Sequence, residues 1–163
     1  GRPPAEVVAV LDAMFRAFDE VAEREGVEKI KTIGDGYFAV AGLPGATGDP
    51  ALAAARMALG MVAAMAEMAE DGLRIRVGLH VGPAVSGVIG KNKFNYDLWG
   101  DTVNVAARME AQAPLGGVAC SPEMAARLTP HFQLESMGRR AVKGKGDIEI
   151  WRLASAGPDV ASA

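Results

Sequence analysis

The sequence predicts an α+β fold: a ferredoxin-like βαββαβ core with extra C-terminal αβ elements. Three observations in the first half of the chain carry this prediction. A helical pattern of apolar residues comes first, two β-branched runs around a glycine-rich turn follow, and a second helical pattern leads into an alternating strand. This order matches a βαββαβ unit without its first strand, so we expect the first strand to be absent from this chain.

The first helix is indicated by apolar residues at helical spacing that end near Gly26. These residues are Val7, Val10, Leu11, Met14, Phe18 and Val21. Two apolar runs between residues 28 and 42 then flank Gly34-Asp35-Gly36. An Asp-Gly step between such runs predicts a tight hairpin turn, because both residues accept a positive φ. Asp35 is therefore expected at the tip of a hairpin.

A second helix is predicted over residues 51–70, the most apolar part of the chain. Arg56 and Glu67 interrupt it, so we interpret it as a packed helix and not as a membrane span. Residues 73–81 then alternate strictly between apolar and other residues, which predicts a strand that buries one face. His80 is expected on the exposed face of this strand, with a structural role.

Further strands are predicted over residues 84–89 and 94–99, followed by a helix over 103–111. Asp101 and Thr102 are expected to cap this helix, because their side chains can accept from free backbone N–H groups.

The C-terminal part predicts a strand over residues 118–120 and a helix capped by Ser121 with Pro122 in its first turn. Two more strands are expected near 132–136 and 148–153. The basic, glycine-containing segment before the last of these strands is predicted to be a flexible loop.

The composition, 50% hydrophobic over 163 residues, suffices for one domain, which we place at residues 1–153 with a disordered tail over 154–163. A formal net charge of −3 argues against nucleic acid as a partner. Cys120 is the single cysteine and only two histidines are present, so neither an internal disulfide nor a His/Cys zinc site can form. We expect a cytoplasmic domain without direct membrane contact.

The helix over 103–111 contains an unexplained polar pair, Asn104 and Arg108. The two residues are four apart and therefore share one helix face. Asparagine is a poor helix former, so folding alone does not explain its place. A solvated Asn–Arg stripe remains the alternative.

Three segments in this order resemble the class III adenylyl/guanylyl cyclase catalytic domain. They are KIKTIGDGY at 29–37, YDLWGDTVNVAARME at 96–110 and VKGKGD at 142–147. The resemblance extends to Leu153. The chain is also similar to the palm of diguanylate cyclases, but the GG(D/E)EF turn of those enzymes is absent. The resemblance implies an adenylate cyclase that converts ATP to 3′,5′-cyclic AMP and pyrophosphate, with two Mg²⁺ or Mn²⁺ ions per site.

The resemblance also assigns roles to individual residues. Asp35 matches one of two metal-binding aspartates, Asn104 the asparagine that orients the ribose, and Arg108 the arginine that faces the charge developing on the α-phosphate. Lys143 matches the lysine on the β- and γ-phosphates, whereas Lys145 receives no firm assignment. The family's other metal aspartate belongs to the first strand, which we expect to be absent here.

The choice of base is predicted by Lys31 and Asp97, which the resemblance places at the base-recognition positions. Adenine offers an acceptor at N1 and a donor at N6, which a lysine and a carboxylate satisfy. Guanine would leave buried groups unpaired at a cost of about 1 to 3 kcal/mol each. Guanylyl members of the family carry a Glu and a Cys at these positions, so ATP is the expected substrate.

A homodimer is the expected assembly. Lys31 and Asp35 would lie about 13 Å apart on one face of an extended strand, too far to grip adjacent atoms. The family pairs two domains head to tail, and each site takes its metal ligands from one chain and its base, ribose and transition-state residues from the other. One chain here carries both sets, which implies two equivalent sites. Two alternatives stay open: a non-catalytic, degenerate or truncated nucleotide-binding or dimerisation module, and a guanylate cyclase.

Overall fold

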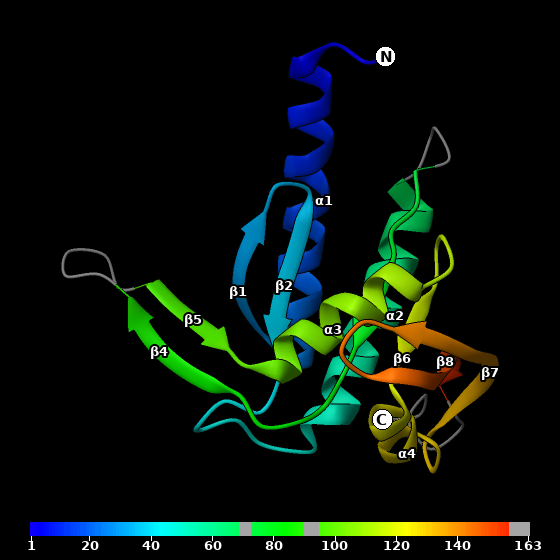
Figure 1. Ribbon diagram of the computed structural model, residues 1–163. Helices are drawn as coiled ribbons and strands as arrows, with labels where there is room; N and C mark the ends of the chain where they lie inside the picture. Colours follow the sequence, from blue (N-terminus) through cyan, green and yellow to red (C-terminus); the bar gives the residue numbers. More distant parts are fainter. Residues whose placement is uncertain (69–72, 90–94, 157–163) are drawn as a thin grey trace. The chain divides into compact units, whose positions relative to one another are not determined.

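The computed structural model describes residues 1–68, 73–89 and 95–156, and it confirms the α+β class (Figure 1). The chain forms two compact units, residues 1–74 and 75–163. The ferredoxin-like arrangement of the core and the domain extent 1–153 stay predictions.

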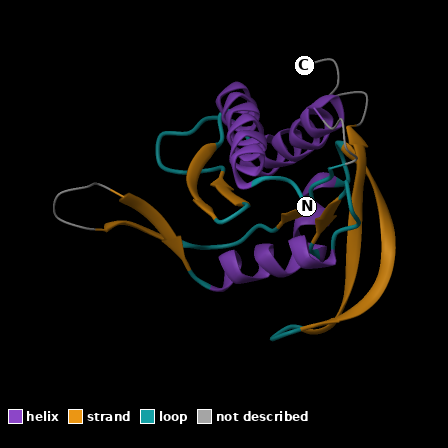
Figure 2. Ribbon diagram, turned by 90° about the horizontal axis from the view of Figure 1, so that it is seen from above, coloured by secondary structure: helices purple, strands orange, loops and turns teal. Residues whose placement is uncertain are grey.

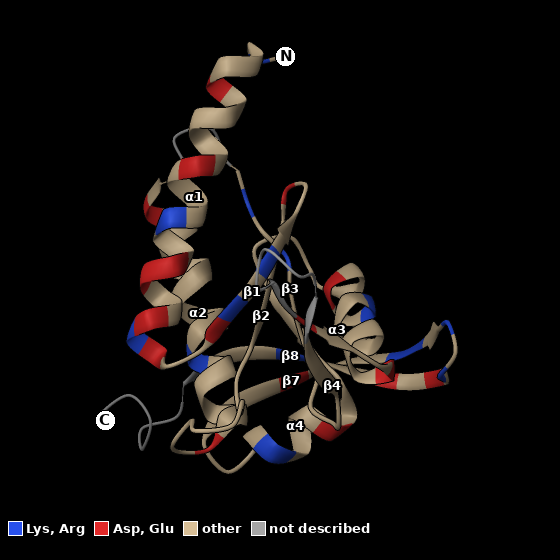
Figure 3. Cartoon of the chain, turned by 90° about the vertical axis from the view of Figure 1, so that its left-hand side faces the viewer, with Lys and Arg blue, Asp and Glu red and all other residues tan. Residues whose placement is uncertain are grey.

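The first unit contains two helices and one hairpin. Its elements are α1 (Pro4–Glu25), β1 (Glu28–Ile33), β2 (Gly36–Val40) and α2 (Pro50–Met68). The predicted end of the first helix is confirmed, because Gly26 adopts a left-handed φ of 71° and its N–H reaches the carbonyl groups of Ala22 and Glu23. Helix α1 carries both acidic and basic residues along its length (Figure 3).

Helices α1 and α2 pack closely against one another. A Cβ atom on Gly60 of α2 would lie 2.8 Å from Cγ1 of Val21, a buried residue of α1. Among the described helices, α2 alone is long and apolar enough to cross a membrane by length and composition. A core helix has the same composition, and seven residues of α2 are buried. The last predicted positions of this helix, 69 and 70, lie outside the described residues.

The hairpin turn is displaced by one residue from its predicted position. Ile33 pairs with Gly36, so Gly34 and Asp35 form the two-residue loop. Gly34 has a φ of 60°, and no described residue other than glycine has a positive φ. Asp35 therefore does not use the positive φ that an Asp-Gly step can accept. Glycine at the first central position is the pattern of a type II′ hairpin turn. Asp35 still lies at the exposed tip.

The hairpin is fastened to α1 through Tyr37. Its hydroxyl donates to Oδ1 of Asp19 at 2.7 Å, and its ring meets the buried Phe18 edge-on at 5.6 Å between centroids. The Lys29 ammonium lies 3.3 Å from the same Asp19 oxygen. Burial and the Asp19 carboxylate both raise the pKa of Tyr37. These contacts hold β1 and β2 along the helix.

The second unit contains a four-stranded sheet, a separate two-stranded ribbon and two helices (Figures 1 and 2). Its elements are β3 (Val77–Leu79), β4 (Val85–Ile89), β5 (Asn95–Trp99), α3 (Asp101–Gln112), β6 (Val118–Cys120), α4 (Pro122–Leu128), β7 (Phe132–Val142) and β8 (Gly146–Ala156). The sheet order is β3-β6-β8-β7, with β3 parallel to β6 and the other pairs antiparallel. Strands β4 and β5 form the ribbon.

Helix α3 covers the sheet through its apolar face. Val105 and Met109 are buried there together with Ile150 of β8. Gly78 of β3 lies against the helix backbone, since a Cβ atom there would come within 2.1 Å of the Glu110 nitrogen. This close contact fixes α3 on the sheet.

Several local predictions are confirmed and others are corrected. Strand β6 has the predicted bounds, and Ser121 caps α4 by accepting from the Met124 N–H at 3.2 Å. The strand predicted over 73–81 covers only Val77–Leu79, because its parallel partner β6 offers three residues to pair with. His80 is largely buried and not exposed, with 10% of its side chain accessible.

The helix caps and the C-terminal hairpin also differ from prediction. Asp101 and Thr102 do not cap α3: no side chain caps this helix, and Thr102 donates to the carbonyl of Pro83 at 2.5 Å. The basic segment predicted as a loop is the end of β7, a tight turn and the start of β8. Residues 154–156 belong to β8, so the predicted tail is shorter, and 157–163 lie outside the described residues.

Candidate active site

One face of α3 presents the polar residues Asp101, Asn104 and Arg108. Their spacing of three and then four residues places them on the same side of the helix. The opposite face carries Val105 and Met109, which are 1% and 0% exposed. The apolar face therefore fixes the rotation of α3, and the polar face with its exposed Asn104 is turned away from the core.

The tight turn between β7 and β8 lies against this polar face. The Lys145 N–H donates to the Val142 carbonyl at 2.9 Å and closes the turn. Arg108 donates from Nη1 to the backbone carbonyl of Lys143. A Cβ atom on Gly144 would lie 2.8 Å from Arg108 Nη1, and Gly144 has a left-handed φ of 79°. The left-handed φ favours glycine at this position, and a larger residue would also displace the Arg108 guanidinium.

An ion pair joins the other end of the turn to α3. Nζ of Lys145 lies 2.6 Å from Oδ2 of Asp101. This hydrogen bond lowers the pKa of Asp101, with smaller contributions from the charges of Lys145 and Arg108. The carboxylate is therefore ionised at neutral pH. The structure thus brings together Arg108 and Lys143, two of the predicted site residues, with Asn104 on the same helix face.

The largely buried His80 lies close enough to Lys145 and Asp101 for their charges to act on it. Nδ1 of His80 is 2.5 Å from Oγ of Ser121 and 3.9 Å from Oε2 of Glu123. Burial lowers the pKa of His80, and the positive charge of Lys145 lowers it further, while Glu123 and Asp101 oppose this shift. The neutral imidazole is favoured.

Asp97, predicted to recognise the base, lies on β5 opposite Gly87 of β4. It is only 9% exposed, and its Oδ1 accepts from the Leu98 N–H at 2.8 Å. A carboxylate held by a backbone donor is a fixed acceptor, as recognition of an exocyclic amine requires.

Lys31 and Asp35 belong to the first unit, residues 1–74. Lys31 is exposed on β1 opposite Phe38, beside an irregularity of register between Lys29 and Lys31. Asp35 is exposed in the turn, beyond the end of β1 at Ile33. The expectation that both lie on one face of a single extended strand was therefore wrong.

The metal prediction can be tested against the donors present. Within the described parts of the chain, no group of three His, Cys, Asp or Glu side chains could hold a metal ion. Mg²⁺ is commonly bound by one or two carboxylates together with substrate phosphates. The exposed carboxylate of Asp35 fits a ligand to an ion that arrives with a nucleotide.

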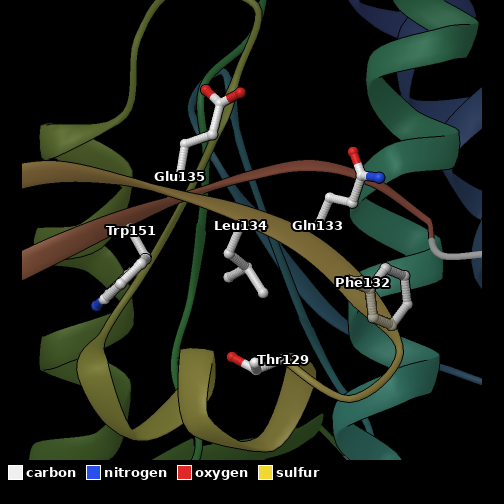
Figure 4. Close-up of a pocket in the computed structure, with 6 residues that line it drawn as sticks. All are labelled: Thr129, Phe132, Gln133, Leu134, Glu135 and Trp151. Atoms are coloured by element: carbon white, nitrogen blue, oxygen red, sulfur yellow. The ribbon is translucent and has the colours of Figure 1, made fainter.

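The sequence prediction missed Asp101 and left Lys145 without a role, although both contribute to this cluster. The spacing of Asp101, Asn104 and Arg108 on one helix face was the available signal. The predicted site residues do not line the hollow of about 440 Å³ at the end of α4 (Figure 4). There, the side chain of Leu134 points toward Thr129.

Comparison with known proteins identifies the family. A family model described as the adenylate and guanylate cyclase catalytic domain matches residues 2–155. An adenylate cyclase of Mycobacterium tuberculosis (strain ATCC 25618 / H37Rv) is 42% identical over 153 residues, which cover 92% of this chain and 34% of that protein. The chain thus spans about a third of the length of this curated relative.

Solved structures agree with this result. The guanylate cyclase domain of RhGC from Catenaria anguillulae, in complex with GTP, matches with a TM-score of 0.85 at 31% identity, covering 95% of this chain and 87% of that one. The adenylyl cyclase CyaB from P. aeruginosa matches with a TM-score of 0.86 at 23% identity, covering 97% and 87%, and supports the fold. The chain therefore belongs to the family of adenylate and guanylate cyclase catalytic domains.

Proposed function

We propose that this domain converts ATP to 3′,5′-cyclic AMP and pyrophosphate. The observation that carries the proposal is the contact between Arg108 on α3 and the Lys143 turn, with Asn104 on the same helix face. Two cations and an amide at one place suit a ribose triphosphate. The 42% identity to an adenylate cyclase supports the same conclusion.

In cyclisation the ribose 3′-hydroxyl loses its proton to solvent and its oxygen bonds to the α-phosphorus, while the bond from that phosphorus to the β-phosphate breaks and pyrophosphate leaves. Catalysis of such a step consists mainly of positioning and charge stabilisation. Asn104 orients the ribose, Lys143 holds the β- and γ-phosphates, and Arg108 stabilises the charge on the α-phosphate. A guanidinium has five N–H donors, so the bond to the Lys143 carbonyl leaves donors for substrate.

Two divalent ions, Mg²⁺ or Mn²⁺, supply further charge neutralisation when bound with the nucleotide. Asp35 is the ligand that this chain offers from its hairpin tip. Asp35 is exposed in its two-residue turn, beyond Ile33 and Gly36, the last pair of the strand ladder.

Selection of adenine rests on Lys31 and Asp97. The Lys31 ammonium donates to adenine N1, and the Asp97 carboxylate accepts from N6. The burial of Asp97 supports this role, because a buried carboxylate favours a donor on the base over an acceptor more strongly than an exposed carboxylate does.

The active form is a homodimer with two equivalent sites. Asp35 of one chain serves the site that receives Lys31, Asp97, Asn104, Arg108 and Lys143 from the other chain. We place the domain in the cytoplasm, where ATP is available, without direct membrane contact and without nucleic acid as a partner.

A guanylate cyclase is the second candidate, favoured by the similarity to a guanylate cyclase domain solved with GTP. A side-by-side assay of the full-length protein with ATP and GTP separates the two. Preferential cyclic AMP formation is expected. Equal or faster GTP turnover would refute the roles of Lys31 and Asp97, and no product from either nucleotide would indicate a non-catalytic module.

A further inference from the structure

The turn between β7 and β8 is held on α3 at both ends. Arg108 donates to the carbonyl of Lys143, and Lys145 pairs with Asp101 at 2.6 Å. Asp101 and Arg108 are seven residues apart, about two helical turns, and therefore project from one face with Asn104 between them. One face of α3 thus binds the first and the last residue of the three-residue turn, Lys143 and Lys145.

The two lysines of this turn are engaged differently. Lys143 is held through its backbone carbonyl, which leaves its exposed ammonium group for other contacts. Lys145 is held through its ammonium, which is 35% exposed at the side-chain level and already has a carboxylate partner. The two lysines of the turn therefore make different contacts, and Lys145 gains a role that the sequence left unassigned.

We propose that Asp101 is a positioning residue, which anchors the turn through Lys145 so that the Lys143 ammonium meets the β- and γ-phosphates. This inference rests on the proposed function and refines it. Lys145 is then the anchor and not a phosphate ligand. The adjacent positive charge of Lys145 also screens the Asp101 carboxylate from a bound triphosphate.

The two assignments of Lys145 predict opposite effects of removing the carboxylate. If Lys145 is an anchor, loss of Asp101 releases the turn and weakens nucleotide binding. If Lys145 binds phosphate, loss of Asp101 frees the Lys145 ammonium for the phosphate. It also removes a carboxylate that repels the triphosphate, so nucleotide binding improves. The sign of the change in KM therefore distinguishes them.

The kinetic test compares Asp101→Asn, Lys145→Met and the double variant in the full-length protein. Each single change is expected to raise KM for ATP about two- to fivefold, as for an exposed ion pair, with kcat within about twofold. The double variant is expected to be no worse than either single one. A lower or unchanged KM in Asp101→Asn, additive losses, or a loss of kcat at constant KM would each overturn the proposal.

Hydrogen exchange tests the anchor without reference to activity. The Lys145 N–H, bonded to Val142, is expected to exchange about two- to fivefold faster in Asp101→Asn. Asp147→Asn removes one negative charge from the β7–β8 hairpin itself and should leave exchange and KM unchanged. Unchanged exchange in Asp101→Asn refutes the anchor. Faster exchange in a protein that makes no cyclic nucleotide supports the anchor and refutes the proposed function.

Discussion

The guanidinium of Arg108 donates a hydrogen bond to the backbone carbonyl of Lys143, thirty-five residues further along the chain. The bond connects the polar face of α3 to the β7–β8 turn. Both residues are positions at which the cyclase resemblance implies phosphate contact. Their proximity is the reason to treat the helix face and the turn as one site.

Replacing Arg108 by alanine is expected to lower kcat about 10²- to 10³-fold, because a donor to charge that develops in the transition state is lost. KM for ATP should change little. Steady-state kinetics with cyclic AMP detection measure both. Arg139→Ala is the matched control, since Arg139 also donates to a backbone carbonyl, that of Asp147, on the same hairpin. A similar loss of kcat in both variants would argue against a catalytic role for Arg108.

Replacing Lys31 by glutamate and Asp97 by cysteine together is expected to shift preference toward GTP. The ratio of kcat/KM for ATP over GTP should fall about 10- to 100-fold, because each changed position reverses one donor–acceptor match. Competition between the two nucleotides in one reaction measures the ratio. An unchanged ratio in a folded double variant would mean that other residues read the base.

Replacing Gly78 by alanine is expected to lower the free energy of unfolding by about 1 to 3 kcal/mol, because the new methyl group meets the backbone of α3. Gly87→Ala is the control: its Cβ would approach only the ring of Trp99, an exposed side chain, at 3.2 Å. Urea unfolding compares the two variants. Equal stability would contradict the close contact between β3 and α3.

The lowered pKa of His80 predicts a loss of stability in acid. The folded protein holds the His80 proton less tightly than the unfolded chain does, so the unfolded state binds more protons as the pH falls through about 6.5. Stability is therefore retained at pH 7.5 and decreases toward pH 5. Unfolding at both pH values should show a smaller decrease for His80→Asn than for the unsubstituted protein. An equal or larger decrease for His80→Asn would contradict the lowering of the His80 pKa by burial.

The sequence predicted best the elements whose signals are local. The cap of α4 by Ser121, with Pro122 after it, involves neighbouring residues only and was predicted correctly. The hairpin was predicted but its turn was misplaced by one residue. The segment offers glycine on both sides of Asp35, and only the pairing of the two strands selects Gly34.

The remaining errors concern partners that lie far away in sequence. Asp101 and Thr102 have good capping side chains, but they bond Lys145 and Pro83 instead, 44 and 19 residues away. The strand around Val77 alternates over nine residues, yet its length follows from the short partner β6. Helix propensity and the apolar pattern carry no information about partners so far away in sequence. The resemblance to cyclases identified Asn104 and Arg108 on α3, but it did not predict the ion pair between Asp101 and Lys145.

In the proposed homodimer, each active site combines residues from two chains. Full-length protein carrying Asp35→Ala and full-length protein carrying Arg108→Ala should each be nearly inactive. After mixing at equal amounts and exchange of subunits, about a quarter of the unsubstituted activity should return, because half of the dimers regain one of two sites. Native mass spectrometry confirms that mixed dimers form. Mixed dimers without recovered cyclic AMP formation would contradict the account.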